Sequence, residues 1–389
     1  MPSLGTDREM KKLASLLLAL ALCGCQGKTQ PIPSASAQST SLPEVAQSQG
    51  EWLPNVRDGF KVEKWADVPN ARSLALSPDG KTLFVGSREG FVHKVTVSES
   101  GPVVEKFQEN VNGANGVCFV GEDLYLGELE RVRKFSPPDG FEPDAKGEVV
   151  LEGLPPEKHH GWRYIKGGPD GRIRIGIGAP CNVCERDDPR FATICSFTTE
   201  GEDFQIEAKG VRNTVGFDWH PETGDLYFTD NGRDMLGDDI PPCELNVLPK
   251  GSPTKHYGFP YLWGNNQPDP DFGDKAPSGI EFTEPLHRFE AHVAPLGCYF
   301  PRSETLRAAL PSQVLVAQHG SWNRSTPIGY RVVSVNLDKP EEPAEPLLWG
   351  FLKSDGTYHG RPVDILELPD GKILVSDDYK GVVWSVTKL

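Results

Sequence analysis

Two absences limit what this chain of 389 residues can be. Beyond residue 50 it has hardly any segment with helical periodicity, and no apolar run there reaches the roughly 18 residues that a transmembrane helix requires. The chain also lacks a basic surplus, since 40 Lys and Arg face 55 Asp and Glu for a formal net charge of −15. That charge repels phosphate backbones and argues against nucleic acid as a partner.

Cysteine occurs in a pattern that does not suit a metal or haem site. Cys181-Asn182-Val183-Cys184 has no second CxxC or HxxxH after it, so a local disulfide or buried thiols are favoured over a zinc half-site. Glu185 stands where a c-type haem motif needs His. Beyond the first 25 residues the six cysteines are an even number that an exported protein can pair, with no pairing specified: Cys118, Cys181, Cys184, Cys195, Cys243 and Cys298.

The first 25 residues are predicted to be a lipoprotein signal peptide. Lys11 and Lys12 precede an apolar stretch over 13–22, which is too short to span a bilayer. The tetrapeptide that ends at Cys25 resembles the bacterial lipobox, in which that cysteine is lipidated. An ordinary signal peptide cleaved nearby is the alternative, and either reading exports the chain.

Residues 26–52 are rich in Gln, Ser, Pro and Ala, and this composition predicts a flexible linker. We therefore expect an exported protein on the periplasmic or cell-envelope side, held to the membrane through its lipid anchor only. Residues 53–389 are predicted to form the catalytic domain.

Six turn signals, each followed by a short β-rich run, dominate that domain. In these turns Pro presets the turn dihedral, Asp caps the turn and Gly accepts positive φ, so each signal predicts a hairpin. The turns lie at residues 77–80, 121–123, 168–171, 220–224, 310–312 and 368–371. A period of roughly 40 to 50 residues is typical of four-stranded propeller blades, so we predict an all-β, six-bladed β-propeller.

One gap between neighbouring turn signals is much longer than the others and spans 90 residues, from Pro221 to Pro311. It contains a segment rich in Pro, Gly, Asp and Asn, roughly from Asp234 to Phe289. We predict a long inserted loop region there, between the fourth and fifth blades, and such stretches are usually functional.

The side chains with chemical potential lie in segments that enter or leave a repeat. His159 and His160 precede the third repeat and are candidate proton acceptors, with Arg163 close behind. Arg212 and Asn213 stand at the corresponding place before the fourth repeat. Equivalent positions of different blades converge on the propeller axis. The alternatives are a surface or packing role for the histidines and a blade-bridging role for Arg212.

Three further segments add polar groups. The acid- and amide-rich stretch 229–239 offers the oxygen ligands that Ca²⁺ prefers, although it could be a solvated acidic loop. Segment 318–324 contains His, Trp, Asn and Arg, and Arg361 precedes the last repeat. Several cations around one axis suit a small, planar anionic ligand.

Taken in order, these segments resemble the soluble pyrroloquinoline quinone (PQQ)-dependent sugar dehydrogenase family, most closely its sorbosone dehydrogenase-like branch. The resemblance covers residues 58–388. Its segments are 159–163, 178–182, 212–213, 230–233, 256–260, 319–324 and 360–362.

The resemblance implies a six-bladed propeller that binds PQQ on its axis and Ca²⁺ beside it. His160, or His159 in its place, would take the substrate proton, and Arg212 would stabilise charge on the reduced quinone. Carbonyls of Gly232 and Arg233 would hold Ca²⁺. The implied cofactor contacts are Asn115, Arg163, Arg212, Asn213, Asn323, Arg324 and Arg361.

The chain departs from the family pattern at two positions. The family has a lysine where Asn323-Arg324 lies and a second arginine where Val363 lies, so Arg324 would have to replace the lysine.

The predicted activity is oxidation of an aldose, a sorbosone-like sugar or a related aldehyde or polyol. Because a haem motif is missing, electrons would pass to a membrane quinone or a separate cytochrome. A Ca²⁺-dependent lactonase and a non-catalytic binding propeller are the alternatives. The lactonase would need carboxylate and amide ligands that converge on the axis, and a binding propeller would give the histidine pair no role.

Overall fold

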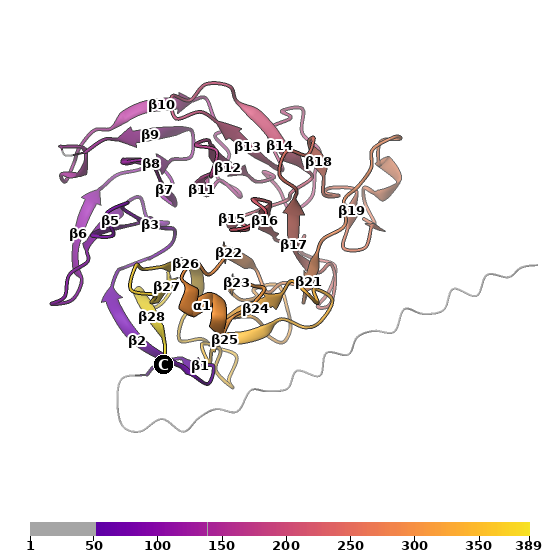
Figure 1. The fold of residues 1–389 in the computed structure, drawn as a ribbon. Helices are drawn as coiled ribbons and strands as arrows, with labels where there is room; N and C mark the ends of the chain where they lie inside the picture. Colours follow the sequence, from indigo (N-terminus) through magenta and orange to yellow (C-terminus); the bar gives the residue numbers. More distant parts are fainter. Residues whose placement is uncertain (1–51, 138) are drawn as a thin grey trace, which may run out of the picture. The chain divides into compact units, whose positions relative to one another are not determined.

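The computed structural model describes residues 52–137 and 139–389, which form six blades of four antiparallel strands arranged around an axis (Figure 1). The predicted all-β, six-bladed propeller is confirmed. The signal peptide, Cys25 and the linker up to residue 51 lie outside the described residues.

The first three blades follow one another along the chain. Blade 1 consists of β3 (Leu74–Leu76), β4 (Thr82–Val85), β5 (Val92–Thr96) and β6 (Val103–Gln108). Blade 2 consists of β7 (Gly116–Val120), β8 (Asp123–Gly127), β9 (Arg131–Phe135) and β10 (Glu148–Glu152), with the short helix η1 (Asp139–Phe141) before β10. Blade 3 consists of β11 (Ile165–Gly167), β12 (Ile173–Ile177), β13 (Thr193–Phe197) and β14 (Gln205–Lys209).

The other three blades are less regular. Blade 4 consists of β15 (Phe217–Trp219), β16 (Leu226–Asp230), β17 (Cys243–Leu248) and β21 (His287–Phe289). Blade 5 consists of β22 (Pro295–Tyr299), β23 (Gln313–Gln318), β24 (Arg331–Asn336) and β25 (Glu345–Trp349), with α1 (Glu304–Ala309) in its first turn. Blade 6 consists of β26 (Pro362–Glu367), β27 (Ile373–Asp377), β28 (Val382–Lys388) and, from the N-terminal side, β2 (Phe60–Asp67).

Each of the six predicted turns joins the first and second strands of one blade. In blade 1, Ser77 donates a hydrogen bond from Oγ to Asp79 Oδ1 over 2.6 Å, and Gly80 has a φ of 71°. Because strands in a blade are antiparallel, these turns lie at one end of every blade. The second-to-third loops and the blade-to-blade connections lie at the other end, which we call the loop face.

The ring is closed by strand β2, which pairs with β28 and becomes the outer strand of blade 6. A two-residue strand, β1 (Asn55–Val56), adds to β25 of blade 5. Trp52, which the sequence analysis placed in the linker, stacks on His359 with ring centroids 4.3 Å apart and also contacts Trp384. Trp52 therefore belongs to the propeller.

Apolar side chains fill the space between neighbouring blades. Phe84 of blade 1 contacts Phe107, and Phe107 contacts Phe135 of blade 2, with centroids 4.9 and 5.2 Å apart. All three rings are buried, and each contributes about 1.5–3 kcal/mol by leaving water. Strand β12 is buried at all five positions, as expected of a strand with a blade on either side.

The predicted insertion between the fourth and fifth blades is not confirmed. The additional residues lie inside blade 4, between its third strand β17 and its outer strand β21. They contain β18 (Lys255–His256), β19 (Leu262–Trp263), β20 (Gln267–Pro268) and η2 (Gly273–Lys275). Strand β18 runs parallel to β14, so the insertion extends blade 3.

Of the two alternatives left open for the CxxC segment, the structure has the local disulfide, because Cys181 and Cys184 are bonded to each other. The other described cysteines are free and buried: Cys118, Cys195, Cys243 and Cys298. Within 52–137 and 139–389, no helix has the length and apolar character needed to cross a membrane.

Candidate functional site on the loop face

His160 lies in the connection that leads into β11, with a φ of 52°. Its Nδ1 is 2.7 Å from the Ala179 carbonyl oxygen. A carbonyl can only accept, so a neutral ring carries its proton on Nδ1 and leaves the Nε2 lone pair available. Burial lowers the pKa of His160 well below its ordinary value, and Arg212 and His159 add to the effect. The imidazole is therefore an unprotonated base at neutral pH.

A glycine after β12 makes room for this base. A Cβ on Gly178 would lie 2.5 Å from the His160 Cβ and 3.2 Å from Asn213 Oδ1. His159 is adjacent, with ring centroids 4.1 Å apart, but it is exposed. Of the two candidate bases, His160 is thus the one that the fold holds in a fixed position.

Arg212, in the connection before β15, is 4% exposed and fixed by oxygen atoms on several sides. Its Nε donates to the Asn182 carbonyl over 2.8 Å and its Nη2 to Asn182 Oδ1 over 3.0 Å. Its Nη1 donates to the carbonyls of Asn231 and Gly232 over 3.1 and 3.0 Å. Because Asn182 lies inside the Cys181–Cys184 disulfide loop, that disulfide helps to orient the guanidinium.

Asn213 follows Arg212, and a carboxylate from the end of β16 fixes both residues. Asp230 accepts hydrogen bonds from the backbone N–H groups of Arg212 and Asn213 over 2.8 and 2.7 Å. Burial raises the pKa of Asp230 to about 6, although these hydrogen bonds oppose the shift. The predicted Arg-Asn pair is therefore held against blade 4 beside His160.

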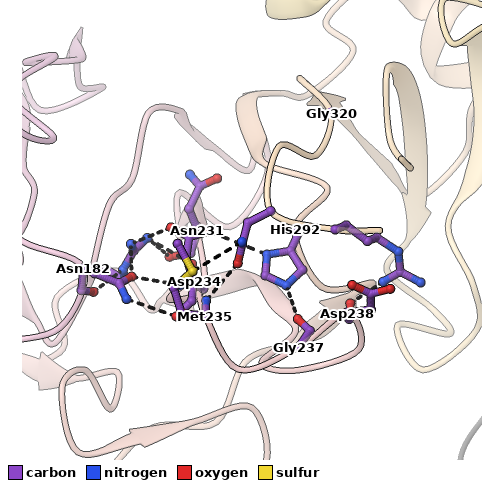
Figure 2. A network of polar contacts seen from close by, with 12 residues as sticks. Asn182, Asn231, Asp234, Met235, Gly237, Asp238, His292 and Gly320 are labelled. Carbon is purple, nitrogen blue, oxygen red and sulfur yellow. Dashed lines mark hydrogen bonds and ion pairs between the residues drawn. The ribbon is translucent and has the colours of Figure 1, made fainter. Parts of the chain in front are cut away.

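Asp234 lies between Arg212 and His292 and forms with them what we call the Asp234 triad (Figure 2). Asp234 Oδ2 is 3.4 Å from Arg212 Nη2, and Oδ1 is 3.6 Å from His292 Nδ1. His292 Nε2 lies 2.8 Å from the Gly237 carbonyl oxygen. The bond to Asp234 is the main cause that raises the pKa of His292. The sequence analysis did not single out His292.

Arg72, Asp378 and His319 form a second group of the same kind, the Asp378 triad. Arg72 Nη1 is 2.6 Å from Asp378 Oδ2, and His319 Nε2 is 2.8 Å from Asp378 Oδ1. Burial lowers the pKa of His319 to about 4. Burial acts in the opposite sense on Asp378, but His319 and Arg72 hold the pKa of that carboxyl far below its ordinary value. The triad is therefore a neutral histidine beside an arginine–aspartate ion pair.

Asn115, a predicted cofactor contact, extends this triad into blade 2. Its side chain is fully buried, and its Oδ1 accepts a hydrogen bond from Arg72 Nε over 2.5 Å. Arg72 and Asp378 carry no motif and were missed in the sequence. They are 306 positions apart and meet because blades 1 and 6 are neighbours in the closed ring.

Arg361 and Arg88 add two cations to this side of the axis. Arg361 donates to the carbonyls of His319 and Gly320, both over 3.0 Å. Arg88 lies over the Trp162 ring at 4.3 Å and has no salt-bridge partner among the described residues. Burial is the main cause that lowers the pKa of Arg72 and the pKa of Arg88, the latter to about 10, and the positive charge of Arg361 adds to both shifts.

The other predicted cofactor contacts lie elsewhere in these loops. Arg163 is 1% exposed, and its guanidinium donates to the carbonyls of Leu129 and Pro155 over 2.9 and 2.5 Å. This pattern is typical of an arginine that fixes a loop, and the predicted cofactor contact of Arg163 stays a prediction. Asn323 accepts from the Met235 N–H over 2.8 Å, and Arg324 is 3.2 Å from Asp239.

The calcium site predicted at the carbonyls of Gly232 and Arg233 stays a prediction, and one of these carbonyls lies against a cation. The Gly232 carbonyl accepts from the Arg212 guanidinium, and Arg233 forms an ion pair with Asp269 at 2.8 Å. A guanidinium beside the carbonyl opposes a second cation at that point. In the part of the chain that the structure describes, no group of three or more His, Cys, Asp or Glu side chains could hold a metal ion.

Comparisons with solved structures bear on the fold. The protein superimposes on the AA12 carbohydrate-active enzyme of Trichoderma reesei with a TM-score of 0.73 and 19% identity, covering 89% of this chain and 100% of that one. The pyranose dehydrogenase PQQ domain of Coprinopsis cinerea superimposes with a TM-score of 0.72 and 19% identity, covering 87% of this chain and 98% of that one. The soluble aldose sugar dehydrogenase of Escherichia coli superimposes with a TM-score of 0.60 and 16% identity, covering 85% of this chain and 100% of that one.

Comparisons of sequence bear on the family. An uncharacterized protein of Borreliella burgdorferi is 33% identical over 347 residues, which cover 85% of this chain and 90% of that protein. Residues 186–389 match the family model described as TrAA12-like. The predicted resemblance is confirmed, while its sorbosone dehydrogenase-like branch stays a prediction. The chain belongs to the TrAA12-like family.

Proposed function

We propose that this protein is a PQQ-dependent oxidoreductase that oxidises an aldose or a related sugar. The observation that carries the proposal is a fixed, unprotonated His160 beside Arg212 on a loop face that also gathers Arg72, Arg88 and Arg361. An unprotonated base and an excess of cations are what sugar oxidation with an anionic quinone requires.

The residues around the axis fit PQQ, a planar quinone that carries carboxylates. Arg88 makes no salt bridge among the described residues, and the charges that act on it come from Arg72, Asp378 and Arg361. Trp162 supplies an aromatic face under two of these guanidiniums, at 5.2 Å from Arg72 and 4.3 Å from Arg88. We assign these residues to the carboxylates of the quinone, and Arg212 and Asn213 to its opposite side.

When bound, PQQ supplies the acceptor for the hydride that leaves the sugar carbon. His160 Nε2 accepts the proton of the hydroxyl on that carbon, while the Ala179 carbonyl holds the ring in the required tautomer. Arg212 would supply positive charge near the reacting atoms, and its bonds to Asn182 keep it there. Its five N–H groups already have protein acceptors, so it would act through its charge. No step of this proposal uses calcium.

The electron acceptor, the sugar and the location complete the proposal as predictions. Electrons would pass to a membrane quinone or a separate cytochrome, and a lipid on Cys25 would hold the domain near such an acceptor. Mass spectrometry of the N-terminal peptide of membrane-extracted protein tests the anchor, because an unmodified Cys25 would contradict it. A sorbosone-like preference would appear as a higher kcat/KM for that sugar than for other aldoses.

Titration of the purified domain with PQQ, followed by dye reduction with a panel of aldoses, tests the function. We expect saturable binding at micromolar PQQ and dye reduction that requires both PQQ and sugar. Absence of PQQ binding at that concentration would overturn the proposal. Hydrolysis of sugar lactones without PQQ would favour a lactonase instead.

A further inference from the structure

The disulfide loop that follows β12 is connected to the candidate site through one side chain. Asn182 lies between Cys181 and Cys184, which are bonded to each other. The Asn182 carbonyl accepts from Arg212 Nε over 2.8 Å, and Asn182 Oδ1 accepts from Arg212 Nη2 over 3.0 Å. Asn182 Oδ1 also accepts from the Asp234 N–H over 2.8 Å, and Nδ2 donates to the Asp234 carbonyl over 3.0 Å (Figure 2). Two members of the Asp234 triad therefore depend on the conformation of this loop.

The disulfide is the restraint that fixes the loop at this point. It joins residues only three positions apart and so confines Asn182 within a closed ring. Residues 181–184 lie outside the strands, so a sheet ladder does not hold them in its place. The segment after the ring has its own attachment, because the Tyr261 hydroxyl donates to Glu185 Oε1 over 2.6 Å. Opening the disulfide would therefore release Asn182 while the rest of the loop stays attached to the insertion of blade 4.

A cavity of about 210 Å³ gives this disulfide an approach that avoids the propeller axis. It lies between the disulfide loop and the insertion, and Cys184 is one of the residues that line it. The volume equals that of roughly seven water molecules and admits a small thiol. Arg186 and Lys209 in its lining suit the carboxylate of an amino-acid-like thiol, and Glu185 and Asp188 suit its ammonium group.

The other described cysteines are poor competitors for such a thiol, because Cys118, Cys195, Cys243 and Cys298 are all buried. Burial raises the pKa of Cys118 and Cys195 to about 12 and the pKa of Cys243 to about 11, and it also raises the pKa of Cys298. The thiolate is the reactive form of cysteine, so these four stay inert. Cys184 is half-buried at the cavity and is the sulfur open to attack.

We propose that Cys184 is a site of thiol–disulfide exchange with a small amino-acid-like thiol, and that this exchange releases Asn182 and with it Arg212. First, the thiolate sulfur of the small thiol bonds to Cys184 Sγ, the Cys181–Cys184 bond breaks, and Cys181 leaves as a thiolate. A second molecule of the thiol attacks the mixed disulfide, so that two small thiols are oxidised to one disulfide while the two cysteines are reduced. The reverse steps close the loop again.

His160 reports the state of the disulfide without PQQ or sugar. Burial is the main cause that lowers the pKa of His160, and the positive charge of Arg212 adds to it. A guanidinium that leaves its fixed position lowers that pKa less, so the pKa of His160 should be higher once the disulfide is open. Only the effect on turnover rests on the proposed function.

The exchange itself can be measured on the full chain with glutathione as the probe. The protein is equilibrated in buffers of reduced and oxidised glutathione, quenched with acid, alkylated and analysed by peptide mass spectrometry. We expect a mixed disulfide on Cys184 but not on Cys181, followed by opening of the bond, with the four buried cysteines free of glutathione. A disulfide that stays closed in an excess of reduced glutathione would overturn the proposal.

NMR titration of the labelled histidines measures the coupling to the site, with the His160 signal assigned from His160→Gln. We expect the pKa of His160 to rise when the disulfide is reduced and to return when it is reoxidised. Asn182→Ala should raise it with the disulfide closed. Cys195→Ser, the matched control that removes a buried thiol from the same blade, should keep the response of the unmodified protein.

The comparison of oxidised and reduced unmodified protein needs no variant, so it is decisive even if a variant fails to fold. An open disulfide with an unchanged pKa of His160 would overturn the coupling to Arg212. An unchanged pKa in Asn182→Ala would remove Asn182 as the connection and would overturn it as well.

Kinetics separate this proposal from the dehydrogenase. Once the thiol is removed by gel filtration, reduced PQQ-loaded protein should have a kcat/KM for an aldose about tenfold lower, and reoxidation should restore it. A response of His160 without PQQ-dependent turnover would leave the exchange site standing and remove the dehydrogenase. Turnover that an open disulfide leaves unchanged would keep the dehydrogenase and overturn the control of Arg212.

Discussion

The Asp234 triad and the Asp378 triad have the same composition and differ in how tightly they are held. In the Asp378 triad the carboxylate contacts are 2.6 and 2.8 Å, whereas in the Asp234 triad they are 3.4 and 3.6 Å. Asp378 is also more deeply buried, with a side chain 6% exposed against 18% for Asp234.

The difference separates a triad that is fixed from a triad whose carboxylate contacts can change when a ligand binds. Charge pairs at hydrogen-bond distance in a buried setting resist rearrangement, since each partner alone would be left desolvated. Longer contacts cost less to break, and the Asp234 triad is the one that touches Arg212. We infer that the side of blades 1 and 6 holds the cofactor. On the side of blades 3 and 4, His160 and Arg212 are fixed by other bonds, and only the contacts of Asp234 can change when a substrate binds.

The largest effect should come from the base beside the Asp234 triad. We expect His160→Gln to lower kcat by about 10²–10⁴-fold, because removal of a positioned general base costs that much. His159→Gln, the matched control on the neighbouring exposed ring, should lower kcat by less than about tenfold. Steady-state dye reduction with PQQ-loaded protein measures both. A larger fall in kcat for His159→Gln would assign the base to His159. Equal small effects would mean that neither histidine acts in the reaction.

The next effect compares the two carboxylates directly. Asp378→Asn would leave Arg72 and His319 buried without their anion, and we expect a loss of about 3–5 kcal/mol and a fall in Tm of roughly 10 °C. Asp234→Asn should lower the free energy of unfolding by less than about 1 kcal/mol. It should nevertheless lower kcat/KM by about tenfold, because Asp234 helps to orient Arg212. Thermal unfolding and kinetics measured on the same samples provide both numbers. Equal losses of stability would mean that the two triads do not differ.

A smaller effect concerns pH, where the two histidines should act in opposite directions. The pKa of His292 is raised by Asp234, so its contribution to stability is complete below the unfolded value near 6.5 and is lost as pH rises through the folded pKa. The pKa of His319 is lowered by burial to about 4, so its contribution is complete above 6.5 and is lost as pH falls toward 4.

Differences in Tm from the unmodified protein isolate these two contributions, because other titrating groups cancel. The destabilisation caused by His292→Gln should decrease as pH rises above about 6.5. The destabilisation caused by His319→Gln should decrease as pH falls from about 6.5 to 4.5. If the destabilisation of both variants decreased in the same direction of pH, the assigned protonation states would be contradicted.

The smallest expected effect is that of calcium on the protein without quinone. Because Arg212 already binds the Gly232 carbonyl, about 1 mM CaCl₂ should change Tm by less than about 1 °C. Differential scanning fluorimetry with MgCl₂ as the control measures this shift. A calcium-specific increase of several degrees would show a preformed site and would contradict the assignment of that carbonyl to Arg212.

The blade count could be predicted from the sequence because each turn is a local structure. Ser77, Asp79 and Gly80 determine their turn within a few residues, whatever the rest of the chain does. The position of the insertion could not be predicted, because β17 follows an acidic loop and its partner β21 lies far along the chain. Strand pairing across such a gap depends on the whole blade.

The candidate site could be predicted only in part, for a similar reason. His160, Arg212, Asn213 and Arg361 lie in recognisable segments. Arg72 and Asp378 are an ordinary arginine and aspartate that meet only when β2 closes the ring. His292 gives a signal only through its partner Asp234.

The central claim is that a sugar delivers its electrons to PQQ on this propeller with His160 as the base. Anaerobic mixing of PQQ-loaded protein with an excess of an aldose, followed by the quinone absorbance in a single turnover, tests it most directly. We predict rapid loss of the oxidised quinone signal in the unmodified protein and a rate at least about a hundredfold lower in His160→Gln. A quinone that binds but keeps its oxidised spectrum with every sugar, or one reduced equally fast without His160, would contradict the claim.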